Sequence, residues 1–403
     1  MKILIISQYF WPENFKINDL SIELIKRNNE VFALTGKPNY PNGKFFKGYG
    51  FFGFKKELYK GIQINRVPML PRKNSSNLNL FLNYLTFFIF SNIFILFNKR
   101  KYDLIFCPAY SPVTVIFSAL LAKVLYKSKC YVWIQDLWPE STYLNGRIKN
   151  NFIKFLLNKM MKFLYQHPDK IFIQAESMRI PIREKLSDKY DNSKVIYLPN
   201  WAEDHYYKKN TYNKASKYLD LIKPSFFNVL FAGNIGSSVD VKSIFKTIFK
   251  LKDNTKIKFI FIGDGSEKEI FQSNVLNNKL KNVEFIPRHD AKEVPQFFEK
   301  ADLLLTSFGN IEIFKYILPS KVPTYMASAK PIVGMANGET ALTIKKAKCG
   351  YIVPACDYNA LAQKIILMSN MSKNELFKLG QNGKKYSMKV FNRDTVIDEI
   401  LRK

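Results

Sequence analysis

The stretch from Tyr316 to Glu339 reads YILPSKVPTYMASAKPIVGMANGE, and the second half of the chain can be interpreted around it. It follows an apolar run, residues 301–308, that predicts a buried strand. Ser320 is the predicted N-cap of a helix with Pro323 near its start, where a missing N–H costs little. Free N–H groups at a helix start suit an anion, and Lys321 adds a full positive charge. We interpret this start as a phosphate site; the alternative is an ordinary helix cap with a solvated lysine.

A carboxylate closes the same stretch. Residues 331–335 predict the next strand, and Asn337-Gly338-Glu339 predicts a turn that brings Glu339 back toward the helix start. A carboxylate in this position can accept hydrogen bonds from the hydroxyls of a ribose or another sugar.

Two glycine turns upstream add to this site. Residues 228–232 predict a strand that runs into Gly233-Asn234-Ile235-Gly236, and residues 256–262 predict one that runs into Gly263-Asp264-Gly265. Such turns let the backbone approach a phosphate closely. Together with Ser320-Lys321 they direct three strand ends to one point, which is stronger evidence than a single glycine turn.

The first half shows the order of a βαβ unit, with strands predicted at 2–7 and 30–35 around a helix at 18–27. Such folds bind ligands in the crevice beyond the strand ends, so the loop 9–16, which contains Glu13, is expected to face the cleft. The loop has no G-x-G-x-x-G, so a dinucleotide fingerprint is absent from it.

Two more carboxylates follow the strand predicted at 129–135, which runs into DLWPES, residues 136–141. Because the carboxyl ends of parallel strands lie at the ligand-binding edge, Asp136 and Glu140 are candidates for binding an acceptor hydroxyl or accepting its proton. The alternative for Glu140 is structural, since Pro139-Glu140 can simply open a helix.

The composition indicates an anionic partner. The 403 residues carry 62 Lys and Arg against 33 Asp and Glu, a net charge of +29 that suits acidic lipid or nucleic acid. The four cysteines show no framework spacing and the three histidines are isolated, so no structural metal is expected.

The most apolar segment, residues 77–98, is uncharged and is flanked by Arg72-Lys73 and Lys99-Arg100-Lys101. Its length permits a transmembrane helix. Predicted strands at 62–67 and 103–107 belong to one sheet, however, and a crossover between them must return to the same side. We therefore expect a helix half in the domain and half on an anionic bilayer surface, with the flanking cations over lipid phosphates. The alternative is a fully buried helix.

Two segments lack clear periodicity. Residues 38–61, rich in glycine, lysine and aromatic side chains, are expected to form a long loop that suits nucleic acid or the water–lipid boundary equally well. Residues 202–225 are polar and aromatic, and they are expected to link two domains.

These motifs together resemble the GT-B glycosyltransferases of family four. The first-half motifs look like those of bacterial O-antigen and capsule enzymes similar to L-fucosamine transferase, of the colanic-acid type. The resemblance covers nearly the whole chain and rests on the two glycine turns and on YFWPE (9–13), DLWPES (136–141), Pro199-Asn200-Trp201, LPSK (318–321), Gly338-Glu339, Cys349-Gly350 and Asp357.

The resemblance implies an α/β fold, GT-B, in which two Rossmann-like domains face a central cleft. It implies an N-terminal acceptor-binding domain over residues 1–205 and a C-terminal nucleotide-sugar-binding domain over residues 206–388. A last helix, residues 389–403, would cross back to the first domain.

The implied activity is that of a retaining hexosyl or N-acetylhexosaminyl glycosyltransferase that uses a nucleotide-sugar, usually a UDP-sugar, without a metal ion or other cofactor. The implied acceptor is a polyprenyl-diphosphate-linked saccharide of O-antigen or capsule biosynthesis. The implied location is cytoplasmic, peripheral on the inner face of the plasma membrane. Expected donor-binding residues are Gly233, Asn234, Gly236, Gly263, Gly265, Ser320, Lys321 and Glu339; expected acceptor-binding residues are Glu13, Asp136 and Glu140; expected catalytic residues are Asp136, Lys321 and Glu13.

The chain departs from the family pattern in two places. Most family-four enzymes carry two glutamates at the positions that match Tyr316 and Thr324, and neither of these residues can act as a carboxylate. Glu339 is a candidate replacement for one of them. Many relatives carry arginine where this chain has Asn234, so Lys321 is expected to balance the leaving diphosphate.

Two other functions stay open. A sugar-nucleotide epimerase of the same fold would act on soluble substrates, and it has no use for the cation-flanked segment 77–98. A nucleic-acid-binding protein is supported only by charge and interleaved aromatic residues, and the glycine turns have no use there, so nucleic acid is not an expected partner.

Overall fold

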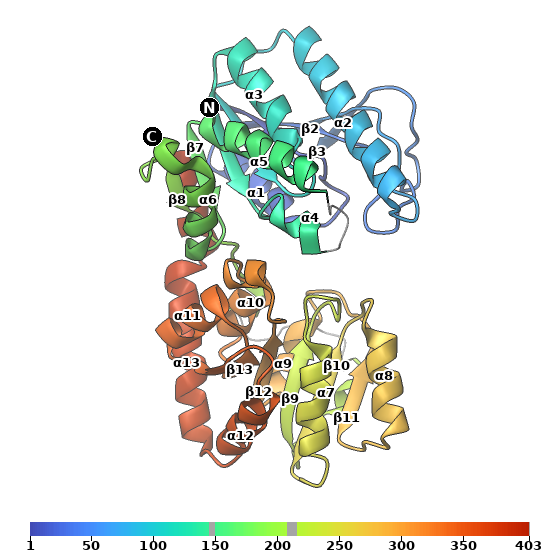
Figure 1. The fold of residues 1–403 in the computed structure, drawn as a ribbon, viewed down its shortest axis with the longest axis vertical. Helices are drawn as coiled ribbons and strands as arrows, with labels where there is room; N and C mark the ends of the chain where they lie inside the picture. Colours follow the sequence, from blue (N-terminus) through green and yellow to red (C-terminus); the bar gives the residue numbers. More distant parts are fainter. Residues whose placement is uncertain (145–149, 208–215, 403) are drawn as a thin grey trace. The chain divides into compact units, whose positions relative to one another are not determined.

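The computed structural model describes residues 1–144, 150–207 and 216–402. The chain forms two compact units, Met1–Leu198 and Pro199–Arg402, each built on its own sheet (Figure 1). Most strands of the two sheets are short apolar runs flanked by helices, as expected of parallel sheets that are buried on both faces.

The first unit contains an eight-stranded sheet in the order β3-β4-β2-β1-β5-β6-β7-β8, in which β3 alone of the described strands is antiparallel to its neighbour. The register places Ile3 opposite both Val31 and Leu104, and all three side chains are buried. The strands are β1 (Lys2–Ile6), β2 (Glu30–Thr35), β3 (Lys55–Tyr59), β4 (Ile62–Arg66), β5 (Leu104–Ala109), β6 (Lys129–Ile134), β7 (Lys170–Ile173) and β8 (Val195–Tyr197).

Three helices of the first unit lie next to one another (Figure 1). The hydroxyls of Ser91 in α2 and Ser118 in α3 approach to 2.9 Å, and the rings of Phe117 in α3 and Phe163 in α5 lie 6.1 Å apart. The α-helices in the described part of this unit are α1 (Lys16–Lys26), α2 (Asn77–Phe97), α3 (Val115–Tyr126), α4 (Glu140–Leu144), α5 (Asn151–Gln166) and α6 (Arg179–Leu186).

Helix α2 is attached to the sheet along one side. Within the described residues it is the one helix that is long and apolar enough to cross a membrane, by length and composition only. Its Phe87 and Ile95 are buried, and its buried Asn83 accepts a hydrogen bond from Gln8 at 2.8 Å. Only 28% of its 18-residue apolar window is buried, so the fully buried alternative is wrong. The contact of its exposed side with a bilayer stays a prediction.

The second unit contains six parallel strands in the order β11-β10-β9-β12-β13-β14. The strand order reverses at β9, so ligands are expected at the carboxyl end of that strand. The strands are β9 (Phe227–Ala232), β10 (Ile257–Ile262), β11 (Val283–Ile286), β12 (Leu303–Ser307), β13 (Ile332–Met335) and β14 (Gly350–Val353).

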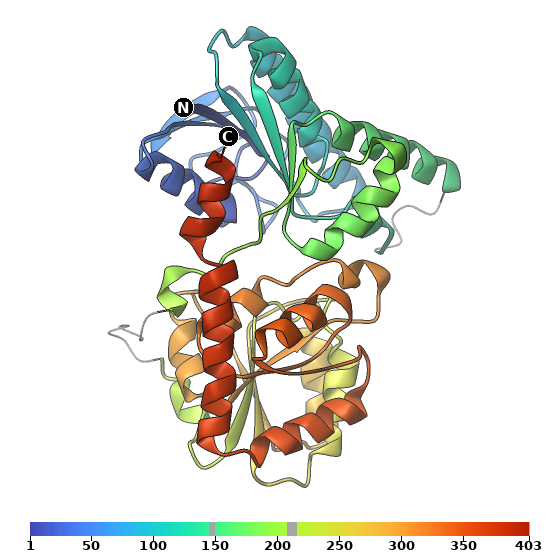
Figure 2. The same cartoon turned by 90° about the vertical axis from the view of Figure 1, so that its left-hand side faces the viewer.

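The long helix α13 packs closely on α10 and α11 (Figure 2). A Cβ atom on Gly380 would lie 2.0 Å from the carbonyl oxygen of Ala329, so glycine is required at this contact. The α-helices in the described part of this unit are α7 (Val241–Lys250), α8 (Lys268–Asn277), α9 (Val294–Lys300), α10 (Lys321–Ala327), α11 (Gly338–Ala347), α12 (Tyr358–Ser369), α13 (Lys373–Val390) and α14 (Arg393–Leu401).

The structure corrects two expectations about unpatterned segments. The predicted loop 38–61 contains β3, whose KKELY sequence is mostly polar because the strand lies at an edge of the sheet. The described part of the predicted linker 202–225 packs into the second unit, where the buried Tyr206 donates its hydroxyl to the carbonyl of Ala291 at 3.1 Å. Residues 208–215 lie outside the described part of the chain.

The two units meet in sequence at Leu198 and Pro199, shortly before the predicted domain limit at 205. Residues 206–388 belong to the second unit, apart from those outside the described ranges. The return of residues 389–403 to the first domain stays a prediction.

Candidate functional site

The two glycine turns of the second unit lie directly against each other. A Cβ atom on Gly263 would lie 2.0 Å from the carbonyl oxygen of Gly233, and Gly263 has a φ of +142°, which a side chain rarely permits. The N–H of Gly233 donates to Ile262 at 2.9 Å, so the turn after β9 is joined to the end of β10. Only glycine permits this approach of the two turns.

Asn234 lies between these turns. The N–H of Ile235 donates to the carbonyl of Asp264 at 2.8 Å, which holds the second half of each turn in place. A Cβ atom on Gly265 would lie 2.6 Å from Oδ1 of Asn234, and one on Gly236 would lie 2.6 Å from Nδ2 of the same side chain. Asn234, Gly236 and Gly265, three of the predicted donor-binding residues, therefore share one small region with Gly233 and Gly263.

Lys321 reaches the same region from α10. Its ammonium lies 3.7 Å from the centroid of the Phe231 ring in β9, and a Cβ atom on Gly233 would lie 3.5 Å from Nζ. The side chain keeps partial exposure, yet burial lowers the pKa of Lys321 to about 7. In the described part of the chain no carboxylate pairs with it. An anion at the glycine turns would supply the missing counter-charge.

Tyr325 holds the end of β9 in position, and the sequence analysis missed it. Its hydroxyl accepts from the N–H of Ala232 at 2.9 Å and donates to the carbonyl of the same residue at 3.1 Å. Tyr325 lies one helical turn after Lys321, so a single rigid helix fixes both the lysine and the strand end. The spacing of four residues was the available signal.

Ser320 is the N-cap residue of α10, as predicted, but its hydroxyl makes no capping hydrogen bond. The Ser320 side chain is exposed, and the backbone carbonyl of Ser320 accepts a hydrogen bond from the Thr324 hydroxyl at 3.2 Å. The hydroxyl is therefore available to a ligand.

Glu339 occupies the first turn of α11, because the predicted turn 337–339 is instead the start of this helix. Gly338 has a φ of +60° and packs against Lys315, where a Cβ atom would lie 2.1 Å from the carbonyl oxygen. Glu339 is buried at 6% exposure, and its charge contributes, after burial, to the raised pKa of Tyr386 in α13. Its donor-binding role stays a prediction.

An unpredicted carboxylate lies beside Tyr316. Glu312 accepts a hydrogen bond from the Tyr316 hydroxyl at 2.9 Å and pairs with Lys315 at 2.6 Å. These side-chain bonds lower the pKa of the exposed Glu312 carboxyl. The tyrosine that stands where the family pattern has a glutamate thus contacts a carboxylate one helical turn earlier in the sequence.

In the first unit, Glu13 is almost fully buried. Its Oε1 accepts from the N–H groups of Asn39 and Tyr40, both at 2.8 Å, and its Oε2 accepts from Phe10 at 3.4 Å. Burial raises the pKa of the Glu13 carboxyl to about 7 in spite of these bonds. The carboxyl group joins the loop after β1 to the loop after β2, so its observed contacts are structural; its catalytic and acceptor-binding roles stay predictions.

Asp136 follows β6 and is exposed, and Ser111 donates a hydrogen bond to its Oδ2 at 3.3 Å. Trp138 donates to the same serine hydroxyl at 2.8 Å, which fixes the serine. Burial and then the charge of Asp136 raise the pKa of Tyr110, whose ring lies 5.0 Å from that of Phe15. Burial by the surrounding protein raises the pKa of the Asp136 carboxyl, although part of the side chain meets solvent. Asp136 is therefore a positioned carboxyl group that a ligand can reach.

Glu140 supports the structural alternative. It is the first residue of α4 and forms an ion pair with Lys185 of α6. Its other oxygen is buried without a hydrogen-bond partner among the described residues. The carboxylate thus joins two helices of the first unit, and its acceptor-binding role stays a prediction. In the described part of the chain, no group of three or more His, Cys, Asp or Glu side chains could hold a metal ion.

Comparison with known proteins finds a family similarity in the second unit. Residues 221–386 match the family described as glycosyl transferases group 1. The probable glycosyltransferase WbjE of Pseudomonas aeruginosa is 23% identical over 277 residues, which cover 67% of this chain and 66% of that protein.

The putative teichuronic acid biosynthesis glycosyltransferase TuaH of Bacillus subtilis (strain 168) is also 23% identical, over 64% of this chain and 61% of its own length. The chain thus matches slightly less than two thirds of the length of either relative.

A solved structure matches the chain over its full length. Anabaena Alr3699/HepE in complex with UDP aligns with a TM-score of 0.68 at 12% identity, covering 100% of this chain and 98% of that one. With the two parallel sheets described above, the match makes the fold GT-B with two Rossmann-like units, as expected from the sequence.

Proposed function

We propose that the chain is a glycosyltransferase that binds the diphosphate of a UDP-sugar at the glycine turns of the second unit. The observation that carries this proposal is Lys321, a cation that pairs with no carboxylate of the described residues and lies within reach of Gly233 and against Phe231. The match of residues 221–386 to the group 1 family supports the activity, and the UDP bound by the structurally similar HepE supports the choice of nucleotide.

The geometry suits a transfer in which the leaving group is an anion. As the bond between the anomeric carbon and the diphosphate breaks, its electron pair goes to the diphosphate, and Lys321 would balance the growing negative charge. The backbone at Gly233 and Gly263 has no side chain in the way of the phosphates. This arrangement requires no metal ion.

We infer a retaining reaction. The acceptor oxygen then bonds to the anomeric carbon on the face from which UDP departs, and the acceptor proton passes to the departing diphosphate. Asp136, exposed at the end of β6, would orient the acceptor hydroxyl by accepting its hydrogen bond. We propose a hexosyl or N-acetylhexosaminyl donor and a polyprenyl-diphosphate-linked saccharide as the acceptor, in O-antigen or capsule biosynthesis. The name of TuaH supports a surface polysaccharide.

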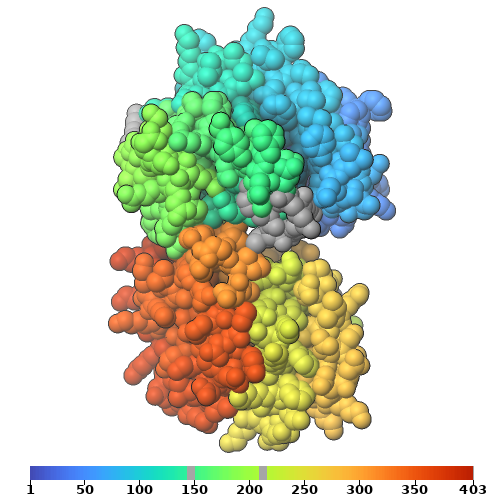
Figure 3. Space-filling model, in the orientation of Figure 1, coloured from blue at the N-terminus to red at the C-terminus, as the bar shows by residue number. Residues whose placement is uncertain are grey.

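A lipid-linked acceptor requires access to a membrane, and the first unit carries a surface that fits one. The exposed sides of α2 and α5 both carry large apolar side chains. Helix α3 contacts both helices, and all three lie on the face of the first unit seen in Figure 3. The large exposed apolar side chains of these two helices are Leu78, Phe81, Leu85, Ile89, Ile93, Leu96, Phe97, Phe152, Ile153, Phe155, Leu156 and Phe163.

Cations accompany this surface. Lys154, Lys159 and Lys162 alternate with the apolar residues of α5, and residues 99–101 follow α2. Apolar side chains next to lysine are typical of a protein that lies on an anionic bilayer. We therefore propose that the protein is peripheral on the inner face of the plasma membrane. Flotation with anionic liposomes, but not with zwitterionic ones, is the expected result.

The donor site is tested by thermal unfolding with UDP in the presence of a chelator. A ligand at 100 times its Kd stabilises a protein by about 2.7 kcal/mol, a shift of several degrees for a domain of this size. ADP serves as the matched control for the diphosphate. Absence of any shift with uridine or adenine nucleotides would contradict the proposed donor site.

The reaction is tested with a panel of UDP-sugars and a polyprenyl-diphosphate sugar. We expect a product that depends on the acceptor and that keeps the anomeric configuration of the donor, as measured by NMR. Conversion of a UDP-sugar in the absence of acceptor would favour the epimerase instead.

A further inference from the structure

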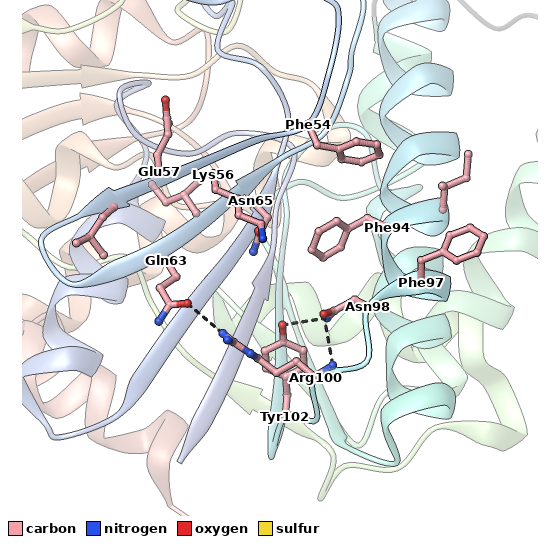
Figure 4. Close-up of a pocket in the computed structure, with 13 residues that line it drawn as sticks. Phe54, Lys56, Glu57, Gln63, Asn65, Phe94, Phe97, Asn98, Arg100 and Tyr102 are labelled. Atoms are coloured by element: carbon pink, nitrogen blue, oxygen red, sulfur yellow. Dashed lines mark hydrogen bonds between the residues drawn. The ribbon is translucent and has the colours of Figure 1, made fainter.

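A groove of about 680 Å³ lies in the first unit, between the β3–β4 hairpin and the last turns of α2 (Figure 4). None of the predicted donor, acceptor or catalytic residues lines it. Its volume is in the range of small-molecule sites. The groove is therefore a candidate site for a ligand other than the donor or the acceptor.

One wall of the groove is aromatic. Phe54 directly precedes β3 and is 54% exposed. Its ring centroid lies 6.3 Å from that of Phe94 in α2. Phe97, at the end of α2, is 81% exposed. Ile93 completes this wall, so the groove opens directly onto the exposed apolar side of α2. An apolar chain lying along α2 can enter the groove without crossing water.

The opposite wall carries an unpaired cation. Arg100 donates from Nη1 to Oε1 of Gln63 at 3.0 Å, and its guanidinium carbon lies 4.4 Å from the centroid of the Phe32 ring. These neutral contacts orient the guanidinium without cancelling its charge, and in the described part of the chain no carboxylate pairs with it. Its remaining N–H donors suit the oxygens of a phosphate.

The other charges of the groove leave it positive. Lys56 adds a second cation to the lining. The carboxylate of Glu57 also lines the groove, but it pairs with the buried Arg66 and with Lys55, the latter at 3.0 Å. Asn98 also lines the groove, and its amide donates to the hydroxyl of Tyr102 at 3.1 Å.

We propose that this groove binds one anionic phospholipid of the membrane, with its phosphate on Arg100 and the start of an acyl chain against Phe94 and Phe97. Free phosphate would leave the aromatic wall open to water, and a neutral apolar molecule would leave Arg100 unpaired, so an amphiphile with a phosphate fits both walls. The proposal rests on the proposed membrane association, which it deepens. A lipid held here would fix how α2 lies on the bilayer.

The test uses the full chain and water-soluble, short-chain lipids below their micelle concentration. Dihexanoyl phosphatidic acid is the probe; dihexanoyl phosphatidylcholine and inorganic phosphate are the comparison ligands. Binding is measured by titration calorimetry for the parent chain and for R100Q and F97A. K101Q is the matched control for R100Q, because Lys101 is exposed and does not line the groove. L78A is the control for F97A, because Leu78 is 66% exposed on the same helix.

We expect the parent chain to prefer phosphatidic acid, and R100Q and F97A each to weaken that binding about tenfold, roughly the effect of one lost charge-assisted hydrogen bond or one lost buried aromatic contact. K101Q and L78A should bind as the parent does. The UDP-induced thermal shift should be the same in all four variants, which shows that they fold.

Three results would overturn the proposal. Equal binding of inorganic phosphate and phosphatidic acid, with no effect of F97A, would make the groove a phosphate site rather than a lipid site. If the protein floats with anionic vesicles but does not bind short-chain lipid, the groove is not a lipid site, while the proposed membrane association stands. Loss of flotation together with loss of lipid binding would reject both.

Discussion

The two units present their polar groups to ligands in opposite ways. In the second unit the region around Gly233 and Gly263 is mostly backbone, and the one strong charge that reaches it, Lys321, has no carboxylate partner among the described residues. In the first unit the carboxylates Glu13 and Glu140 are already bonded within the protein. A site whose charge is unpaired before the ligand arrives gains its counter-ion from the ligand, whereas a bonded carboxylate must first give up a contact.

The substitution G263A tests most directly whether the glycine turns form the ligand site of the second unit. In G263A the new Cβ atom would meet the Gly233 carbonyl, and alanine disfavours the positive φ. We expect the second unit to lose about 3 kcal/mol of stability and the chain to lose UDP binding. Thermal unfolding with and without UDP measures both. G50A is the control, because nothing lies within 4 Å of the added Cβ atom there and its cost should be within about 0.5 kcal/mol.

Removal of the unpaired cation should separate chemistry from folding. K321A is expected to unfold at nearly the parent temperature, since the lysine forms no ion pair with any described residue. Turnover is expected to fall by about 10²–10³ because the leaving diphosphate loses its counter-charge. Steady-state kinetics with a UDP-sugar measure this. K346A, an exposed lysine of α11, should retain full activity. Unchanged turnover in K321A would exclude Lys321 from the mechanism.

Glu13 is expected to make the stability of the first unit depend on pH. Its folded-state pKa, raised to about 7, means that the folded protein holds the proton more tightly than the unfolded chain does. The stability from this group is therefore present below about pH 4.5 and is lost as the pH rises through 7, by about 3 kcal/mol in total. Denaturant unfolding between pH 4.5 and 8 should show this slope, and E13Q should lack it. Equal slopes in the two proteins would show that Glu13 is ionised throughout.

The smallest expected effect is a pH dependence of UDP binding. Burial lowers the pKa of Lys321 to about 7, and a bound diphosphate favours the charged lysine. Above pH 7 binding should take up a proton, so UDP affinity should fall with rising pH, at most about tenfold per unit. Calorimetry in buffers of different ionisation enthalpy measures the proton uptake. K321A should show none, and a pH-independent affinity in the parent chain would contradict the lowered pKa.

The sequence predicted the second unit better than the first. Gly233 and Gly263 belong to short motifs at strand ends, and a turn that excludes Cβ atoms can be recognised locally. The bonds of Glu13 to Asn39 and Tyr40 join loops that are distant in the sequence, so no local pattern indicates them. For the same reason the sequence left two interpretations of Glu140 open, a ligand contact or a helix start. No local pattern indicated its ion pair with Lys185.

Other omissions have physical reasons of their own. The sequence analysis read β3 as loop because an edge strand needs no alternation of apolar residues. Helix α5 was not anticipated, although its buried residues Met161, Leu164 and Tyr165 recur at helical spacing. Glu312 was missed because its bond to Tyr316 replaces a glutamate of the family pattern with a pair of side chains.

The edge strand β3 also bears on how copies of the chain meet. Its free side presents unpaired backbone groups that another strand could join, but Lys55 and Lys56 stand at adjacent positions along it. Two such edges brought together would oppose like charges at close range, which discourages edge-to-edge aggregation. A protein crowded onto a surface encounters its own copies often, so this edge would help to keep the molecules separate.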